Sequence, residues 1–299
     1  MDTGLHLYSR FLHVNLDPTR GANIHQIESN AGGRDSWLFC DPSRASSSSP
    51  DRYDDVWIGG FEELFPNDAA GEFDGRNLPD HGELWNAAFD VVERSDSMAW
   101  LRRECKAVPA VVDKRIEADP EAPRFTVHYR IQNTGDERLW FLFKLHPAVR
   151  IEPGDEILLP GGAVAPVDAG FSRMLAGPGT WPRGPRLGGG TIDLSVVPER
   201  GELKEFVYVS DMPDGWCGLR RSRTGQSIIF KYPRDVLPYC WIFMTYGGWR
   251  DYYTVVLEPC TNIPKDLGEA RRRQSCAFLD PKYVLELTVS VEVQGVHGR

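Results

Sequence analysis

Apolar and polar residues alternate along much of this chain, a pattern typical of β-strands. Every second residue of Arg124–Asn133 is apolar: Phe125, Val127, Tyr129 and Ile131. In an extended strand these side chains face one side of the sheet. The chain also contains 29 glycines and 22 prolines, mainly between such segments, where they mark turns. The pattern predicts an all-β protein.

Other segments fit this architecture. The run Leu139–Leu145 follows turn-forming residues at Asn133–Glu137, so we expect it to form an antiparallel hairpin with Arg124–Asn133. Further expected strands are Phe206–Ser210, Ser227–Tyr232, Tyr239–Tyr246, Tyr252–Leu257 and Val284–Val293. A short helix is expected over Asp266–Gln274. We therefore predict one large antiparallel β-sandwich with few short helices, in which residues 1–299 form a single domain.

Composition narrows the classes of function. The formal net charge of −9 disfavours nonspecific nucleic-acid binding, because that binding needs a basic surface to displace counterions. No apolar stretch approaches the roughly 20 residues that span a bilayer. Residues 1–6 lack the basic and apolar regions of a signal peptide. We therefore expect a cytoplasmic protein that acts on a small molecule and binds neither nucleic acid nor membrane.

The metal-binding residue types are scattered. The six cysteines include no close pair, and no two of the seven histidines have the spacing of metal ligands on a helix. We therefore expect free, reduced cysteines, no metal site and no cofactor.

Three short segments far apart in the sequence each present an ionisable side chain next to a glycine or proline. They are Pro-Asp-His81-Gly-Glu83-Leu-Trp85, Leu-His146-Pro-Ala-Val-Arg150 and Val-Val-Leu-Glu258-Pro. His146 and Glu258 stand at the end of apolar runs, directly before a proline that interrupts strand pairing. Strand ends in a concave sheet can point an acid and a base at one bound molecule, so the functional site is expected here.

A further pair of acids lies in an apolar setting. Glu62 and Glu63 are adjacent between apolar residues of one segment. If this segment is a strand, successive side chains face opposite sides, so one of the two must face inward or line a cleft.

The three segments, in this order, resemble the aldose 1-epimerase (galactose mutarotase-like) superfamily over roughly residues 59–268. The resemblance implies the galactose mutarotase-like supersandwich, a large antiparallel β-sandwich that binds a sugar in an open cleft. It also implies that His146 is the general acid, that Glu258 is the general base and that His81 binds sugar oxygens.

The remaining positions are matched more loosely. The family has an aspartate between the two catalytic segments that contacts sugar hydroxyls, and the nearest match here is Glu205, with Asp211 second. The usual aromatic residue and asparagine after His-Pro are replaced by a segment that ends in Arg150. With Glu83 and Trp85 of the first segment, Glu205 and Arg150 complete the expected substrate-binding residues.

The chemistry of such a site can be argued from the residue types. Mutarotation opens a hemiacetal by removing the proton of the anomeric hydroxyl while the ring oxygen is protonated. It therefore needs one base and one acid with pKa values near the working pH. A partly buried glutamate and a histidine suit these roles. The predicted function is interconversion of the α and β anomers of a hexose or related sugar by a monomer or homodimer.

Two other functions remain open at this point. A non-catalytic carbohydrate-binding protein would use the same sandwich cleft, and the nine tryptophans and ten tyrosines suit sugar binding in either case. A polysaccharide lyase-like enzyme would need a base and a tyrosine aimed at a uronic acid, with positive groups neutralising its carboxylate. The lack of a recognisable signal peptide disfavours the lyase.

Overall fold

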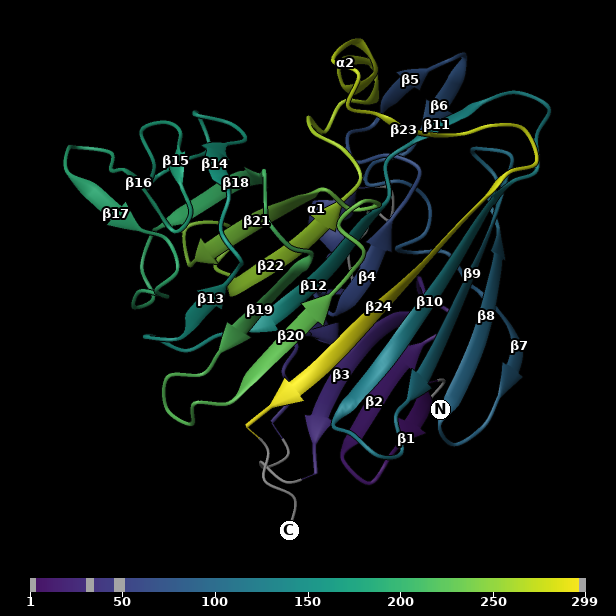
Figure 1. The fold of residues 1–299 in the computed structure, drawn as a ribbon, viewed down its shortest axis with the longest axis horizontal. Coiled ribbons are helices and arrows are strands. Elements are labelled where there is room, and N and C mark those ends of the chain that lie inside the picture. Colours follow the sequence, from purple (N-terminus) through teal and green to yellow (C-terminus); the bar gives the residue numbers. More distant parts are fainter. Residues whose placement is uncertain (1–3, 31–34, 46–51, 296–299) are drawn as a thin grey trace.

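The fold consists mainly of two antiparallel β-sheets (Figure 1). The computed structural model describes residues 4–30, 35–45 and 52–295. Within these residues the larger sheet has 12 strands, in the spatial order β1 (Leu5–Tyr8), β2 (Leu12–Asp17), β3 (Asn23–Ser29), β4 (Phe61–Leu64), β12 (Lys144–Arg150), β22 (Tyr253–Cys260), β21 (Tyr239–Tyr246), β18 (Lys204–Ser210), β14 (Ala163–Pro166), β15 (Gly179–Thr180), β16 (Arg183–Pro185) and β17 (Thr191–Asp193).

The smaller sheet and the remaining elements complete the described part of the chain. The smaller sheet there has eight strands, in the order β13 (Glu156–Leu158), β19 (Trp216–Arg220), β20 (Ser227–Lys231), β24 (Val284–Gln294), β10 (Arg124–Asn133), β9 (Ala110–Ala118), β8 (Met98–Glu104) and β7 (Asp90–Arg94). Two small ribbons pair β5 (Gly71–Phe73) with β6 (Arg76–Leu78) and β11 (Leu139–Phe141) with β23 (Ala277–Leu279). The helical elements are α1 (Tyr53–Val56), α2 (Leu267–Arg272) and a 3₁₀ turn, Pro42–Ala45.

The two large sheets pack against each other. In Figure 1 the strands β8, β9 and β10 overlap β1, β2 and β3 of the larger sheet, and apolar side chains from both sheets belong to one hydrophobic cluster. This confirms the predicted all-β sandwich with few short helices; the single-domain organisation stays a prediction. No helix in the described ranges is long and apolar enough to cross a membrane.

Several predicted elements match the structure closely. Strand β10 has the predicted bounds. Its apolar residues are buried and alternate with more exposed polar residues. The predicted strand Tyr239–Tyr246 is β21. The predicted helix is α2, which begins where the Asp266 side chain accepts a hydrogen bond from the Glu269 backbone N–H at 2.7 Å.

The predicted hairpin between Arg124–Asn133 and Leu139–Leu145 is wrong. Both edges of β10 are occupied, one by β9 and the other by β24. The run after the turn divides into β11, which pairs with β23, and β12, which lies inside the larger sheet. The chain therefore crosses from one sheet to the other after Asn133, and this crossing brings His146 into the larger sheet.

A buried ion pair joins the two sheets inside the core. Lys114 on β9 and Glu63 on β4 are each 1% exposed, and their charged atoms lie 2.8 Å apart. The Tyr129 hydroxyl on β10 also donates to Glu63, and Lys114 donates to the Ala22 carbonyl. Because a buried charge is tolerated only with such partners, this contact fixes which side of β4 faces the core.

We predict that Lys114→Met strongly destabilises the protein. Methionine fills similar space, but the Glu63 carboxylate would remain buried without its partner cation. The free energy of unfolding should fall by about 3–5 kcal/mol, as is usual when one member of a buried pair is removed. Urea unfolding measures the change.

Lys231→Met is the matched control, since the pair between Lys231 and the half-buried Glu292 lies at the surface, in contact with solvent. Exposed pairs contribute at most about 1 kcal/mol, so this variant should unfold close to the parent. Equal losses in the two variants would contradict a special role for the buried pair.

Candidate active site

The candidate site lies on the face of the larger sheet that points away from the smaller sheet. Leu145, Leu257 and Ile242 belong to the core between the sheets. Because successive side chains of a strand face opposite sides, their neighbours His146 and Glu258 face the other way. Helix α1 and several loops cover this face.

These elements enclose a cavity of about 200 Å³ above strands β12, β22, β21 and β18. Its lining combines aromatic rings with ionisable groups. The lining residues are Tyr53, Asp54, Trp57, Asp68, His81, Lys144, His146, Phe171, Phe206, Phe243, Trp249, Val256, Glu258 and Lys265. Three of the residues predicted from sequence, His81, His146 and Glu258, therefore meet at one cavity.

His146 and Glu258 come from neighbouring strands. The register pairs Lys144 with Cys260 and Ala148 with Val256, which sets His146 across from Glu258. The His146 Nε2 lies 3.7 Å from the Glu258 Oε1. Both side chains are buried, so an acid–base pair is held in a low-dielectric setting where small changes of environment move pKa values strongly.

Lys144 connects two carboxylates on the floor of the cavity. Its ammonium lies 2.5 Å from Asp68 and 2.7 Å from the Oε2 of Glu258, and it stacks 4.1 Å from the centre of the Trp241 ring. Burial raises the pKa of Glu258, and the Lys144 ammonium partly offsets this rise. Burial lowers the pKa of His146 well below its usual value, and the positive charge of Lys144 lowers it further.

A second buried carboxylate stands behind His146. The Glu62 Oε1 accepts a short hydrogen bond from the Tyr53 hydroxyl and another from the Trp57 indole N–H at 3.1 Å. The Tyr53 oxygen also lies 3.2 Å from the His146 Nδ1. Burial raises the pKa of Glu62 to about 7, although the Tyr53 hydrogen bond opposes the shift.

His81 lies at the rim of the cavity in a sharp turn. Its ring stacks on Tyr53 with centroids 3.8 Å apart, and its Nδ1 lies 2.9 Å from the Asp80 carboxylate. The next residue must be glycine, because Gly82 has φ = 72° and a Cβ there would lie 2.3 Å from the Phe65 carbonyl oxygen. Burial disfavours the charged ring of His81, but Asp80 and Asp68 outweigh this and raise its pKa.

Two other predicted residues of the first and second segments lie outside the cavity lining. The Glu83 carboxylate accepts hydrogen bonds from the backbone N–H groups of Lys106 and Ala107, at 2.7 and 2.9 Å, and so fastens a neighbouring loop. Arg150 is exposed at the end of β12.

Trp85 and Glu205 are buried next to the cavity but not in its lining. Trp85 packs edge-on against Tyr53 and donates to the Asp80 carbonyl at 3.1 Å. Glu205 accepts backbone N–H bonds from Met174 and Leu175 at 3.1 and 2.8 Å. Both residues therefore support the segments around the cavity, and direct substrate binding by either stays a prediction.

Among the site residues that sequence reasoning missed are Tyr53, Asp68 and Lys144. For Lys144 a signal was present, since a lone cation in the apolar run Leu139–Leu145 requires a buried partner. Tyr53 and Asp68 stand in polar segments without periodicity, and only the folded chain brings them to the cavity.

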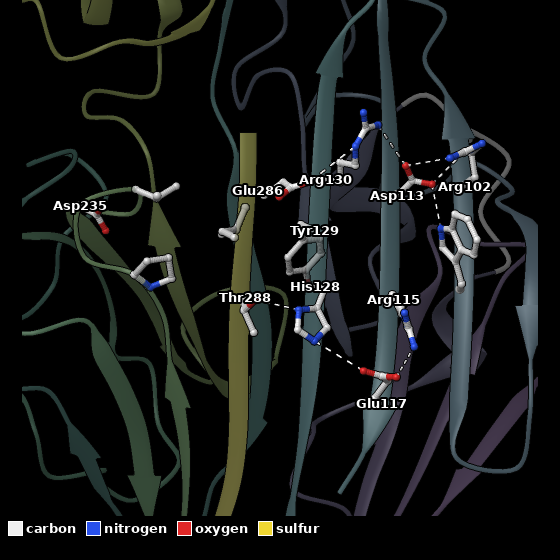
Figure 2. A pocket seen from close by; sticks show the side chains of 14 residues that line it. Arg102, Asp113, Arg115, Glu117, His128, Tyr129, Arg130, Asp235, Glu286 and Thr288 are labelled. Atoms are coloured by element: carbon white, nitrogen blue, oxygen red, sulfur yellow. Dashed lines mark hydrogen bonds and ion pairs between the residues drawn. The ribbon is translucent and has the colours of Figure 1, made fainter. Parts of the chain in front are cut away.

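A larger hollow of about 950 Å³ lies on the outer face of the smaller sheet (Figure 2). Its charged side chains pair with one another. Asp113 binds Arg102 at 2.8 Å, and Glu117 binds Arg115 at 2.5 Å and lies 3.7 Å from His128. Apart from the buried Asp113, these groups lie at the surface and neutralise one another, whereas the smaller cavity has buried groups with strongly shifted pKa values. The smaller cavity is therefore the better candidate for catalysis.

Comparison of the sequence with known protein families and with curated proteins gives no match. The fold, however, is similar to several solved structures. The Slr1438 protein of Synechocystis sp. PCC 6803 superimposes with a TM-score of 0.73 at 15% identity, covering 97% of this chain and 95% of that one. A candidate aldose 1-epimerase of Escherichia coli K12 has a TM-score of 0.69 at 16% identity, covering 98% and 99%.

A galactose mutarotase-related enzyme of Lactobacillus acidophilus has a TM-score of 0.68 at 14% identity, covering 99% of each chain. The structural neighbours are thus aldose 1-epimerase and galactose mutarotase-like proteins, as the sequence resemblance predicted. At these identities the likeness establishes the fold.

We predict that Asp80→Asn lowers the pKa of His81, because the variant replaces the hydrogen-bonded carboxylate with a neutral amide. A histidine whose pKa is raised by folding stabilises the protein below its unfolded pKa of about 6.5, and this stabilisation is lost as pH rises through the folded pKa. The variant should therefore lose more stability at about pH 5.5 than at about pH 8.5.

Proton NMR titration of the His81 ring and urea unfolding at the two pH values measure these effects. Asp235→Asn, at an exposed aspartate beside the outer hollow, is the control and should leave the His81 titration unchanged. An unaltered His81 pKa in Asp80→Asn would show that another group raises it.

Proposed function

We propose that the protein is a cofactor-independent aldose 1-epimerase that interconverts the α and β anomers of a hexose or related sugar. The observation that carries the proposal is the placement of His146 and Glu258, 3.7 Å apart, in one cavity with aromatic walls. The similarity of the fold to an aldose 1-epimerase candidate and to a galactose mutarotase-related enzyme supports the same activity. We further propose that it works in the cytoplasm as a monomer or homodimer.

The two groups match the geometry of the reaction. The anomeric hydroxyl oxygen and the ring oxygen are bonded to the same sugar carbon, so an acid and a base a few ångströms apart can reach both. Glu258, whose pKa is raised by burial, accepts the hydroxyl proton through the oxygen that Lys144 leaves free. His146 donates to the ring oxygen, the ring opens, and closure with reversed roles gives the other anomer.

The cavity walls suit a sugar ring. The C–H faces of a pyranose pack on aromatic side chains, and Trp57, Phe243 and Trp249 offer such surfaces. The polar lining groups Asp68 and Lys265 provide an acceptor and a donor for hydroxyl groups. Binding in such a site fixes the anomeric carbon over the acid–base pair.

A second candidate function is sugar binding without turnover. The observation that favours it is the 2.7 Å contact between the Lys144 ammonium and Glu258, because a paired carboxylate is a weaker base. This function predicts the same ligands and the same cavity but no change in the rate of anomer exchange.

Polarimetry of freshly dissolved α-glucose and α-galactose, with and without the protein, separates the two functions. The enzyme accelerates the approach to the equilibrium rotation. Calorimetric binding of either sugar with an unaccelerated rotation would instead identify a binding protein.

We predict that Glu258→Gln lowers turnover by about 10²–10⁴-fold, the usual contribution of a general base. The amide keeps nearly the same shape and leaves sugar binding largely intact, but it does not accept the anomeric proton. His146→Asn should reduce turnover comparably. The double variant should lose less than the product of the two effects, because the two groups act as one unit.

Melting temperature and sugar affinity are the controls for these variants, since a loss of either would reflect misfolding or altered binding. Parental mutarotation by Glu258→Gln at saturating sugar would show that a different group is the base.

A further inference from the structure

The Nδ1 of the His146 ring is hydrogen-bonded to the Tyr53 hydroxyl, which can be either the donor or the acceptor. The Tyr53 hydroxyl contacts the His146 Nδ1 at 3.2 Å and forms a short hydrogen bond to the Glu62 Oε1, and the Nδ1 and the Oε1 are themselves 3.5 Å apart. All three residues are at most 6% exposed, so water competes little for these contacts. The hydroxyl has a single proton, and it can donate to only one of its two neighbours.

We propose that Glu62 and Tyr53 are positioning residues that decide which ring nitrogen of His146 carries the proton, so that protonation of Glu62 turns the His146 Nε2 into a donor toward the cavity. The catalytic consequence rests on the proposed function, whereas the arrangement of protons does not.

With Glu62 ionised, the order of donors is fixed. Tyr53 donates its proton to the carboxylate, so its oxygen offers only lone pairs to His146. The His146 proton must then lie on Nδ1. The Nε2, which faces Glu258 at 3.7 Å, has a lone pair and no hydrogen to donate.

Protonation of Glu62 reverses the order. The new proton belongs on Oε1, because the Tyr53 oxygen beside it can accept a hydrogen bond while Oε1 still accepts from the Trp57 N–H. The neighbour of Oε2 is the amide nitrogen of Asn23 at 3.5 Å, which is only a donor. Glu62 then donates to the Tyr53 oxygen, and Tyr53 donates to the His146 Nδ1. The ring proton is displaced to Nε2 by exchange with solvent in the cavity, and one proton is taken up overall.

The pKa of Glu62 places this change of tautomer near neutral pH. Burial raises the pKa of Glu62 to about 7, against the hydrogen bond from Tyr53 and the charges of Arg20 and His81. The pKa of His146 lies well below its usual value, so the ring stays neutral while Glu62 titrates and only its tautomer changes.

Other ionisable groups surround this chain of contacts. Lys144 adds positive charge from β12, and the charge of Glu63 favours a protonated Glu62. Asp54 and Glu258 act on Tyr53, and Glu62 in turn raises the pKa of the nearby Cys40 thiol. The lysine is held by Asp68 and Glu258 and keeps its charge across this range. His81, which stacks on Tyr53, has a pKa raised by Asp80 and Asp68, and its positive charge opposes protonation of Glu62.

Nitrogen-15 NMR of the His146 ring in the sugar-free protein tests the proposal. The signals are assigned by comparison with His146→Asn. Between about pH 5.5 and 8.5, the protonated nitrogen should change from Nε2 to Nδ1 as pH rises, with a midpoint at about 7. A constant tautomer over this range in the parent protein would overturn the proposal.

Variants identify the groups responsible. Tyr53→Phe removes the hydroxyl, and Glu62→Gln replaces the titrating group with an amide, so both should lose the change of tautomer near pH 7. Tyr252→Phe is the matched control, because its buried hydroxyl donates to the Trp57 carbonyl in the same cluster and not to His146. A change of tautomer that persists in Tyr53→Phe would also overturn the proposal; if that variant does not fold, Glu62→Gln decides.

Mutarotation rates extend the test to catalysis. The Nε2 donor is lost as pH rises through the pKa of Glu62, so turnover by the parent should fall about tenfold per pH unit above about 7. Glu62→Gln should not show this decline. A parent that changes tautomer but does not accelerate mutarotation would refute the proposed function and leave the proton arrangement standing.

Discussion

The ion pair between the buried residues Lys114 and Glu63 sets which face of strand β4 points into the core, and the order of the residues around the cavity depends on that orientation. Since side chains of a strand alternate, holding Glu63 in the core directs Glu62 to the opposite face. The register of β4 with β12 then sets Glu62 across from His146. A slip of β4 by one residue would exchange the two acids, so the contact that joins the sheets also orders the cavity.

Two carboxylates beside His146 have contrasting environments. Glu258 is paired with the cation Lys144, whereas Glu62 accepts hydrogen bonds from the neutral donors Tyr53 and Trp57. Burial raises the pKa of both, but only one has a neighbouring positive charge in direct contact. Such differences allow chemically identical groups to serve different roles at one pH.

The sequence predicts the fold better than it predicts the site. Alternation and turn residues locate long strands such as β10 and β21, because periodicity is a local property. It does not reveal that the chain changes sheets after Asn133, since that depends on which strand edges are already paired. At the site, His146 and Glu258 stand out beside prolines, whereas Tyr53 reaches the cavity only through tertiary packing.

Pro147 and Pro259 follow His146 and Glu258 on neighbouring strands, and neither has a backbone hydrogen to share. The paired residues pass from Lys144 with Cys260 to Ala148 with Val256, one pair on each side of the two functional residues. Strands β12 and β22 are therefore paired on both sides of a short stretch in which few backbone hydrogen bonds join them. Through this stretch β12 stays paired with β4, and β22 with β21, so the positions of the two functional side chains are set by the outer neighbours of their strands.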